Sequence, residues 1–193
     1  MNARFGPDVD VSHAAFVHES VQLYGKMRVA EGVSIWPNVV ARAETQEIVV
    51  GAYTNLQDFV MLHVGYTMPT IVGAHCSITH RVTLHGCTVG DNCLIGIGAT
   101  LMDGCVIGEN SIVAGHTIVG EGVVVPPHSI VAGVPGKVIK TRDNFIANRL
   151  NAWMYYRNAI AYAAGDHRAW ADSAALAAFA REEARLRAER GAV

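Results

Sequence analysis

Aliphatic residues recur at every sixth position through the middle of the chain. The run consists of Val89, Ile95, Leu101, Ile107, Val113, Val119, Val125 and Val131. Upstream, Val72, Ile78 and Leu84 keep the same spacing but are displaced by one residue. A period of six matches neither an amphipathic α-helix, which repeats about every 3.6 residues, nor a flat strand, which repeats about every two.

A six-residue period predicts a parallel β-helix with three short strands in each coil of about 18 residues. The aliphatic residue points into the prism, and the fourth residue after it is small or β-branched and lies near a corner. Three cysteines occupy this small inward position and are interpreted as core residues: Cys76, Cys93 and Cys105. Three histidines fall where the chain faces outward and are expected on the surface: His75, His116 and His128.

The repeat is expected to end near Val134, where proline and glycine follow. Asp143 is a candidate helix N-cap, and residues 144–163 carry a helical apolar pattern. A Gly-Asp pair at 165–166 separates this helix from an alanine-rich second helix over residues 168–189. The sequence therefore predicts a β-helix domain over residues 1–140 and a C-terminal helical segment over residues 141–193.

Charge and composition limit the partners of the chain. The net charge is −2, which argues against binding to nucleic acid or an anionic membrane. No apolar run approaches the roughly 18 residues of a membrane span, and no long apolar segment marks the N-terminus as a secretory signal. The four cysteines form no C-x-x-C pair. These features favour a soluble cytoplasmic protein.

Two histidines occupy the same place in their repeats. His63 follows the aliphatic Leu62, and His85 follows the aliphatic Leu84. They are 22 residues apart, which is one coil plus four residues, and the extra residues fit a loop over Gly65–Thr70. The two histidines are therefore expected to stack about 4.8 Å apart, where their imidazoles can share a metal ion.

A third histidine, His80, lies on the preceding face of the coil. A rigid prism cannot easily turn it onto a metal ion held by His63 and His85 of the same chain. It can reach a metal ion held by a neighbouring copy. The register therefore predicts a site shared between subunits and repeated three times in a homotrimer.

Several stretches resemble the γ-class carbonic anhydrases. They are SIWPNVVARAE at 34–44, TNLQDFVMLHV at 54–64, SITHRVTLHGCTVGDNCLIGIGATLMDG at 77–104 and the later IVAGVPGKVIK. The resemblance covers about residues 9–160 and implies a left-handed β-helix. It also implies that His63, His80 and His85 are metal ligands, with His80 donated by the adjacent subunit. Zinc is the expected metal, and iron or cobalt could occupy the same ligands.

The resemblance also assigns roles to four other residues. It implies that Gln57 holds the metal-bound water and that Arg42 and Asp58 form an ion pair at the subunit interface. Glu44 stands where the family usually has Asp, which keeps the carboxylate on a longer arm. The loop Gly65–Thr70 is uncharged, whereas the best-known member of the family has an acidic loop there that is thought to shuttle protons.

The activity implied by the resemblance is hydration of carbon dioxide to bicarbonate by metal-bound hydroxide. Three alternatives remain open at this point. The same metal site could hydrolyse acyl-CoA thioesters. The chain could be a CoA-dependent hexapeptide acyltransferase, which commonly uses a lone histidine and no metal. It could also be a non-catalytic scaffold with a structural metal.

Overall fold

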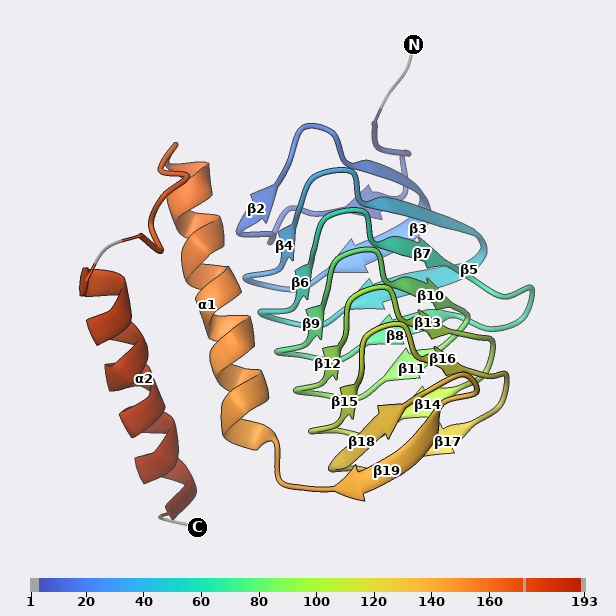
Figure 1. Ribbon diagram of the computed structural model, residues 1–193. Coiled ribbons are helices and arrows are strands. Elements are labelled where there is room, and N and C mark those ends of the chain that lie inside the picture. Colours follow the sequence, from blue (N-terminus) through green and yellow to red (C-terminus); the bar gives the residue numbers. More distant parts are fainter. Residues whose placement is uncertain (1–3, 172, 192–193) are drawn as a thin grey trace.

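The computed structural model describes residues 4–171 and 173–191. The chain winds into a triangular prism of short parallel strands, followed by two helices on one side, α1 (Phe145–Ala163) and α2 (Ser173–Gly191) (Figure 1). This confirms the predicted left-handed parallel β-helix with C-terminal helices.

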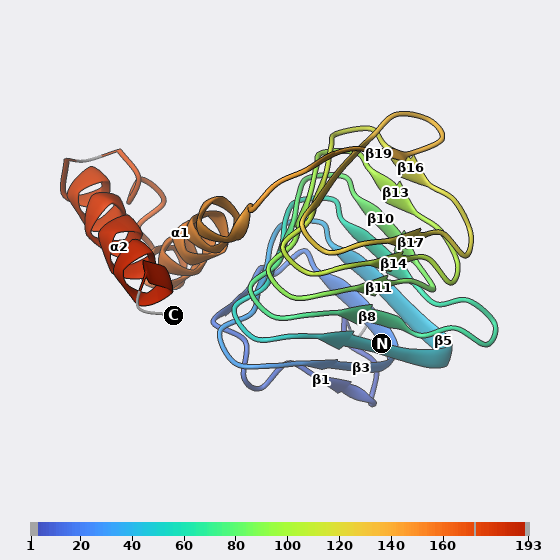
Figure 2. The same ribbon diagram turned by 90° about the horizontal axis from the view of Figure 1, so that it is seen from below.

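The prism has three faces, which Figure 2 shows nearly end-on. The first face contains β7 (Met61–His63), β10 (Thr83–His85), β13 (Thr100–Leu101) and β16 (Ile118–Val119). The second face contains β8 (Thr70–Val72), β11 (Thr88–Val89), β14 (Val106–Ile107) and β17 (Val124–Val125). The third face contains β2 (Phe16–Val17), β4 (Ser34–Ile35), β6 (Asn55–Leu56), β9 (Ser77–Ile78), β12 (Leu94–Ile95), β15 (Ile112–Val113) and β18 (Ser129–Ala132).

Two long strands join the first and second faces at the N-terminal end of the prism. β5 (Val40–Val50) pairs with β7 through its first residues and with β8 through its last. β3 (Gln22–Val29) pairs with β5 along both parts and with the short β1 (Val9–Asp10). At the opposite end, β19 (Lys137–Thr141) pairs antiparallel with β18. The parallel repeat therefore ends at Ala132, close to the predicted end near Val134.

The six-residue period places one aliphatic side chain from each short strand inside the prism. Ile78, Leu84, Ile95 and Leu101 have no exposed surface. Cys76, Cys93 and Cys105 are also buried and carry free thiols, which confirms their interpretation as core residues, and Cys87 is buried in the same way.

The expectation of a solvent-exposed surface position was correct for His116 but wrong for His75. The ring of His75 stacks on Tyr53 with 5.3 Å between centroids. Burial, together with the nearby charge of Arg149, lowers the pKa of His75 to about 4. The repeat pattern could not predict this burial, because it comes from tertiary packing: Arg149 belongs to α1, which covers this part of the coil. His128 is likewise partly buried.

Helix α1 (Phe145–Ala163) packs along the third face, and α2 (Ser173–Gly191) packs on the outer side of α1 (Figure 1, Figure 2). The N-cap position of α1 belongs to Asn144, one residue after the predicted Asp143, whose carboxylate accepts the backbone N–H of Phe145. The predicted start of the second helix near residue 168 was wrong. The carboxylate of Asp166 accepts the N–H of Arg168 and holds a turn there.

Buried amides and aromatic rings attach α1 to the prism. The side chain of Asn148 donates to the carbonyl oxygens of Asn92 and Ser111. Tyr155 and Tyr162 of α1 both pack edge-on against Trp36. Within residues 4–171 and 173–191, no helix combines the length and the apolar character that crossing a membrane requires.

Candidate metal centre

His63 and His85 end two adjacent strands of the first face. They are direct partners in the parallel pairing of β7 and β10. Leu62 and Leu84 fill the core, so alternation turns the following histidine of each strand outward. The ring centroids are 4.9 Å apart, and Nδ1 of His63 lies 3.0 Å from Nε2 of His85. The predicted stacking of these two histidines is confirmed.

A carboxylate contacts the other nitrogen of each ring. Oε2 of Glu44 lies 3.1 Å from Nε2 of His63, and Oδ1 of Asp103 lies 2.6 Å from Nδ1 of His85. When Nε2 of His63 and Nδ1 of His85 carry the protons, the two nitrogens that face each other carry no proton and point their lone pairs at one another. Two lone pairs that face each other at 3.0 Å repel unless a proton or a metal cation lies between them.

These residues fit a divalent metal ion. Two nitrogens bound to one tetrahedral zinc ion at about 2.0–2.1 Å lie roughly 3.3 Å apart, close to the observed separation. The carboxylates behind the rings are the partners that metal-bound histidines ordinarily have. We call His63 and His85, with Glu44 and Asp103, the histidine-pair half-site.

His80 lies in the turn between β9 and β10, on the other edge of the first face. Its Nδ1 lies 2.9 Å from Oδ2 of Asp58, which precedes it by one coil, and its side chain is 41% exposed. We call His80 and Asp58 the single-histidine half-site. Within the described part of one chain, no three His, Cys, Asp or Glu side chains converge as a metal-binding group. The histidine pair and the single histidine of one chain therefore lie at opposite edges of one face.

Arg42 and Glu44 lie next to each other on β5. Nη1 of Arg42 is 2.5 Å from Oε1 of Glu44, and both side chains are about half exposed. Partial desolvation raises the pKa of Glu44, but the backbone N–H of Glu44 and the charges of Arg42 and His63 outweigh it and lower this pKa overall. Asp58 contacts His80 in the same chain, so the predicted Arg42–Asp58 pair between two subunits stays a prediction.

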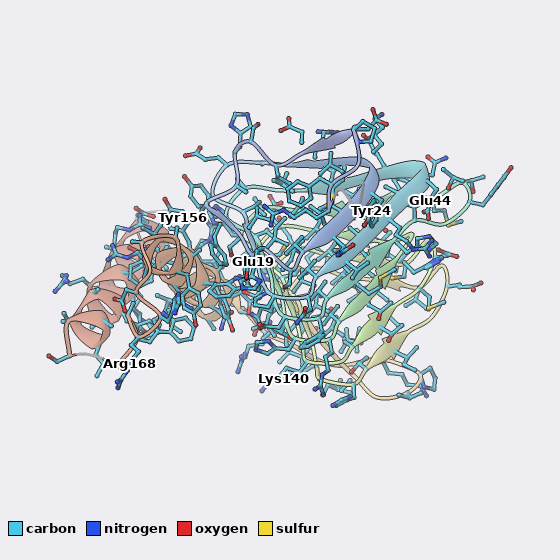
Figure 3. The ribbon with its side chains drawn as sticks, turned by 90° about the horizontal axis from the view of Figure 1, so that it is seen from above. Glu19, Tyr24, Glu44, Lys140, Tyr156 and Arg168 are labelled. Carbon is cyan, nitrogen blue, oxygen red and sulfur yellow. The ribbon has the colours of Figure 1, made fainter. Side chains whose placement is uncertain are left out.

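Gln57 and Tyr155 belong to the surroundings of His80. Gln57 is buried immediately before Asp58, and its Nε2 donates to Oδ1 of Asn55 at 2.9 Å. Burial and the charge of Asp58 raise the pKa of Tyr155 to about 12, so this phenol of α1 lies close to Asp58. Figure 3 shows that Glu44 lies on the side of the prism remote from the two helices. Only the single-histidine half-site is next to α1.

Asp103 is the site residue that motif reasoning missed. It lies 18 residues after His85, which is about one coil, and the same spacing rule that paired the histidines could have found it.

Comparisons with known proteins identify several relatives. Residues 86–119 match the family described as bacterial transferase hexapeptide (six repeats). A probable carbonic anhydrase of Methanocaldococcus jannaschii is 41% identical over 149 residues, which cover 76% of this chain and 94% of that protein. The mitochondrial gamma carbonic anhydrase 2 of Arabidopsis thaliana is 37% identical over 98 residues, or 48% of this chain and 35% of that protein.

A solved structure from Bacillus cereus, provisionally described as an acetyltransferase, has a TM-score of 0.77 and 29% identity. The alignment covers 82% of this chain and 95% of that one.

Proposed function

The chain belongs to the γ carbonic anhydrase family, and from this premise we propose that it hydrates carbon dioxide to bicarbonate at metal sites shared between the subunits of a homotrimer. The observation that carries the proposal is the pair of ring nitrogens of His63 and His85 that face each other at 3.0 Å, each ring held from behind by a carboxylate. A polar surface alone would not require two stacked histidines that are each oriented by a carboxylate.

The shared site follows from the positions of the two half-sites. His63 and His85 lie at one edge of the first face, and His80 lies at the other. A head-to-tail contact that brings one edge of a subunit against the opposite edge of the next completes a three-histidine site. Such a heterologous contact forms a closed ring when the rotation between subunits closes, and the family resemblance implies a ring of three.

The resident metal in this proposal is zinc, and iron or cobalt could occupy the same ligands. A divalent metal held by three neutral imidazoles keeps its charge and an open position, and so acidifies a coordinated water. The residues of this chain would orient the reactants. His63 and His85 would bind it through the nitrogens that their carboxylates leave free, and His80 of the neighbouring subunit would add the third donor. The family resemblance assigns to Gln57, which immediately precedes Asp58, the role of holding a water molecule.

The acyltransferase alternative draws support from the Bacillus cereus structure. That chemistry needs one histidine base, whereas three histidines here each have a carboxylate partner. Acyl-CoA hydrolysis is compatible with the same metal site. A paired experiment separates these activities: bicarbonate formation and acyl-CoA hydrolysis or transfer are measured on one preparation, before and after metal removal. Transfer that survives chelation, without hydration in any buffer, would contradict the proposal.

A further inference from the structure

We propose that Asp103 is a positioning residue for the metal ligand His85, and that Gly65 and Gly86 provide the space in which its carboxylate reaches the ring. This inference rests on the proposed metal site. It concerns the affinity and geometry of metal binding, which can be measured without any assay of turnover.

The contact between Asp103 and His85 determines which ring nitrogen is available. Oδ1 of Asp103 lies 2.6 Å from Nδ1 of His85, and both side chains are 30% exposed. A carboxylate at this distance keeps the proton on Nδ1, because only a protonated nitrogen can donate to it. The lone pair is then on Nε2, which is the atom that faces His63. The contact also fixes the rotation of the ring.

Two glycines leave room for this carboxylate. A Cβ atom added to Gly86 would lie 2.2 Å from Oδ1 of Asp103, and one added to Gly65 would lie 2.8 Å from the same atom. Gly86 also has a φ of +55°, which side chains rarely adopt. Any larger residue at either position would push the carboxylate off the ring. Gly65 begins the loop that interrupts the repeat, so the loop and the metal ligand meet at Asp103.

The solenoid contains a matched arrangement in which the carboxylate accepts a hydrogen bond from the backbone instead of contacting a metal-ligand candidate. Oδ1 of Asp91 accepts the backbone N–H of Ala74 at 2.8 Å, and a Cβ atom on Gly73 would lie 2.4 Å from that oxygen. A carboxylate packed over a glycine thus occurs at two corners of the coil. At Asp103 the carboxylate contacts an imidazole instead of a backbone N–H. Asp91 is therefore the control for any general effect of losing a corner carboxylate.

The test compares zinc affinity in the full-length protein. Wild type, Asp103→Ala, Asp103→Asn, Asp91→Ala and His85→Ala are stripped of metal and titrated with Zn²⁺ against a chromophoric chelator. We expect Asp103→Ala to weaken binding about 10- to 100-fold, the usual effect of losing the partner of a metal-bound histidine. Asp103→Asn keeps an acceptor oxygen without the charge and should lose less. Asp91→Ala should bind as wild type does.

A spectroscopic arm reports on geometry. Co²⁺ in place of zinc should give a visible absorption spectrum that changes in Asp103→Ala and is largely restored in Asp103→Asn. Wild-type affinity and an unchanged Co²⁺ spectrum in both Asp103 variants, with metal binding abolished in His85→Ala, would overturn this inference and leave the proposed function standing. Equal weakening in Asp91→Ala would also overturn it. A wild-type protein that binds no stoichiometric metal would overturn both.

Discussion

The histidine-pair half-site and the single-histidine half-site differ in what positions their side chains. His63 and His85 are set by the ladder of the first face, where one strand lies directly above the other. His80 is set by a turn, by its contact with Asp58 and by the packing of α1 nearby. A regular coil can stack two ligands on one edge, but it cannot bring a ligand from another edge to the same point. In the proposed site, the third donor would therefore come from another chain.

The largest effect is expected when the histidine-pair half-site is broken. Changing His63 or His85 to Ala leaves a single ring nitrogen where two converged, so metal content should fall from about one ion per chain to near zero. Elemental analysis of purified protein measures this. His116→Asn, an exposed histidine in the same repeat, is the control and should keep its metal. Full metal content in both alanine variants would contradict the assignment.

Mixing the two kinds of broken chain tests whether the halves belong to different subunits. His80→Ala chains keep the pair, and His63→Ala chains keep the single histidine. In a cyclic trimer that contains both, one of the three junctions is complete, so a mixed trimer should recover about a third of wild-type activity. Differently tagged chains are refolded together, and the doubly tagged trimers are isolated and assayed. The unmixed variants should stay inactive, and inactive mixed trimers of normal fold would count against sharing.

A smaller effect is expected from Arg42→Ala. In the proposed ring, Arg42 of one subunit would pair with Asp58 of the next, and removing one partner of a buried ion pair typically costs about 3–5 kcal/mol. The trimer should then dissociate at higher protein concentration, as measured by analytical ultracentrifugation. Arg28→Ala removes an exposed contact with Glu47 on another face and is the matched control. An unchanged dissociation concentration in Arg42→Ala would mean that the pair does not cross the interface.

The two half-sites also differ in how far the sequence predicts them. The hexapeptide period and the coil length follow from counting residues. They were enough to place His63 above His85 and to separate His80 from both, although His80 lies in the turn before β10 and not on the preceding face. Contacts that depend on a neighbouring element were not accessible in this way. The burial of His75 needs α1 above it, and the approach of Tyr155 to Asp58 needs the packing of a helix that no repeat encodes. The contact of Asp103 with His85 needs the space that the missing side chains of two glycines leave free.

The smallest effect is expected on proton export. It depends on which proton-transfer groups lie in or beside each half-site. Each cycle of hydration releases a proton, and its transfer to bulk water is fastest through a group whose pKa is near the working pH. The pKa of Glu44 in the histidine-pair half-site is lowered, which moves it further from neutrality, so at pH 7 this carboxylate is a weak proton acceptor. The pKa of Tyr155 beside the other half-site is about 12, so this phenol is a weak donor.

The loop Gly65–Thr70 next to His63 contains no ionisable group except the phenol of Tyr66. We therefore expect slow hydration in dilute buffer and a rate that rises with the concentration of an imidazole buffer, measured by stopped-flow at constant ionic strength. Tyr66 is 86% exposed, and Tyr66→His places an imidazole of pKa about 6.5 there. This variant should become less dependent on buffer, whereas Tyr66→Phe should behave as the wild type does. A wild-type rate that is already high and independent of buffer would show that a group in one of the half-sites transfers the proton unaided.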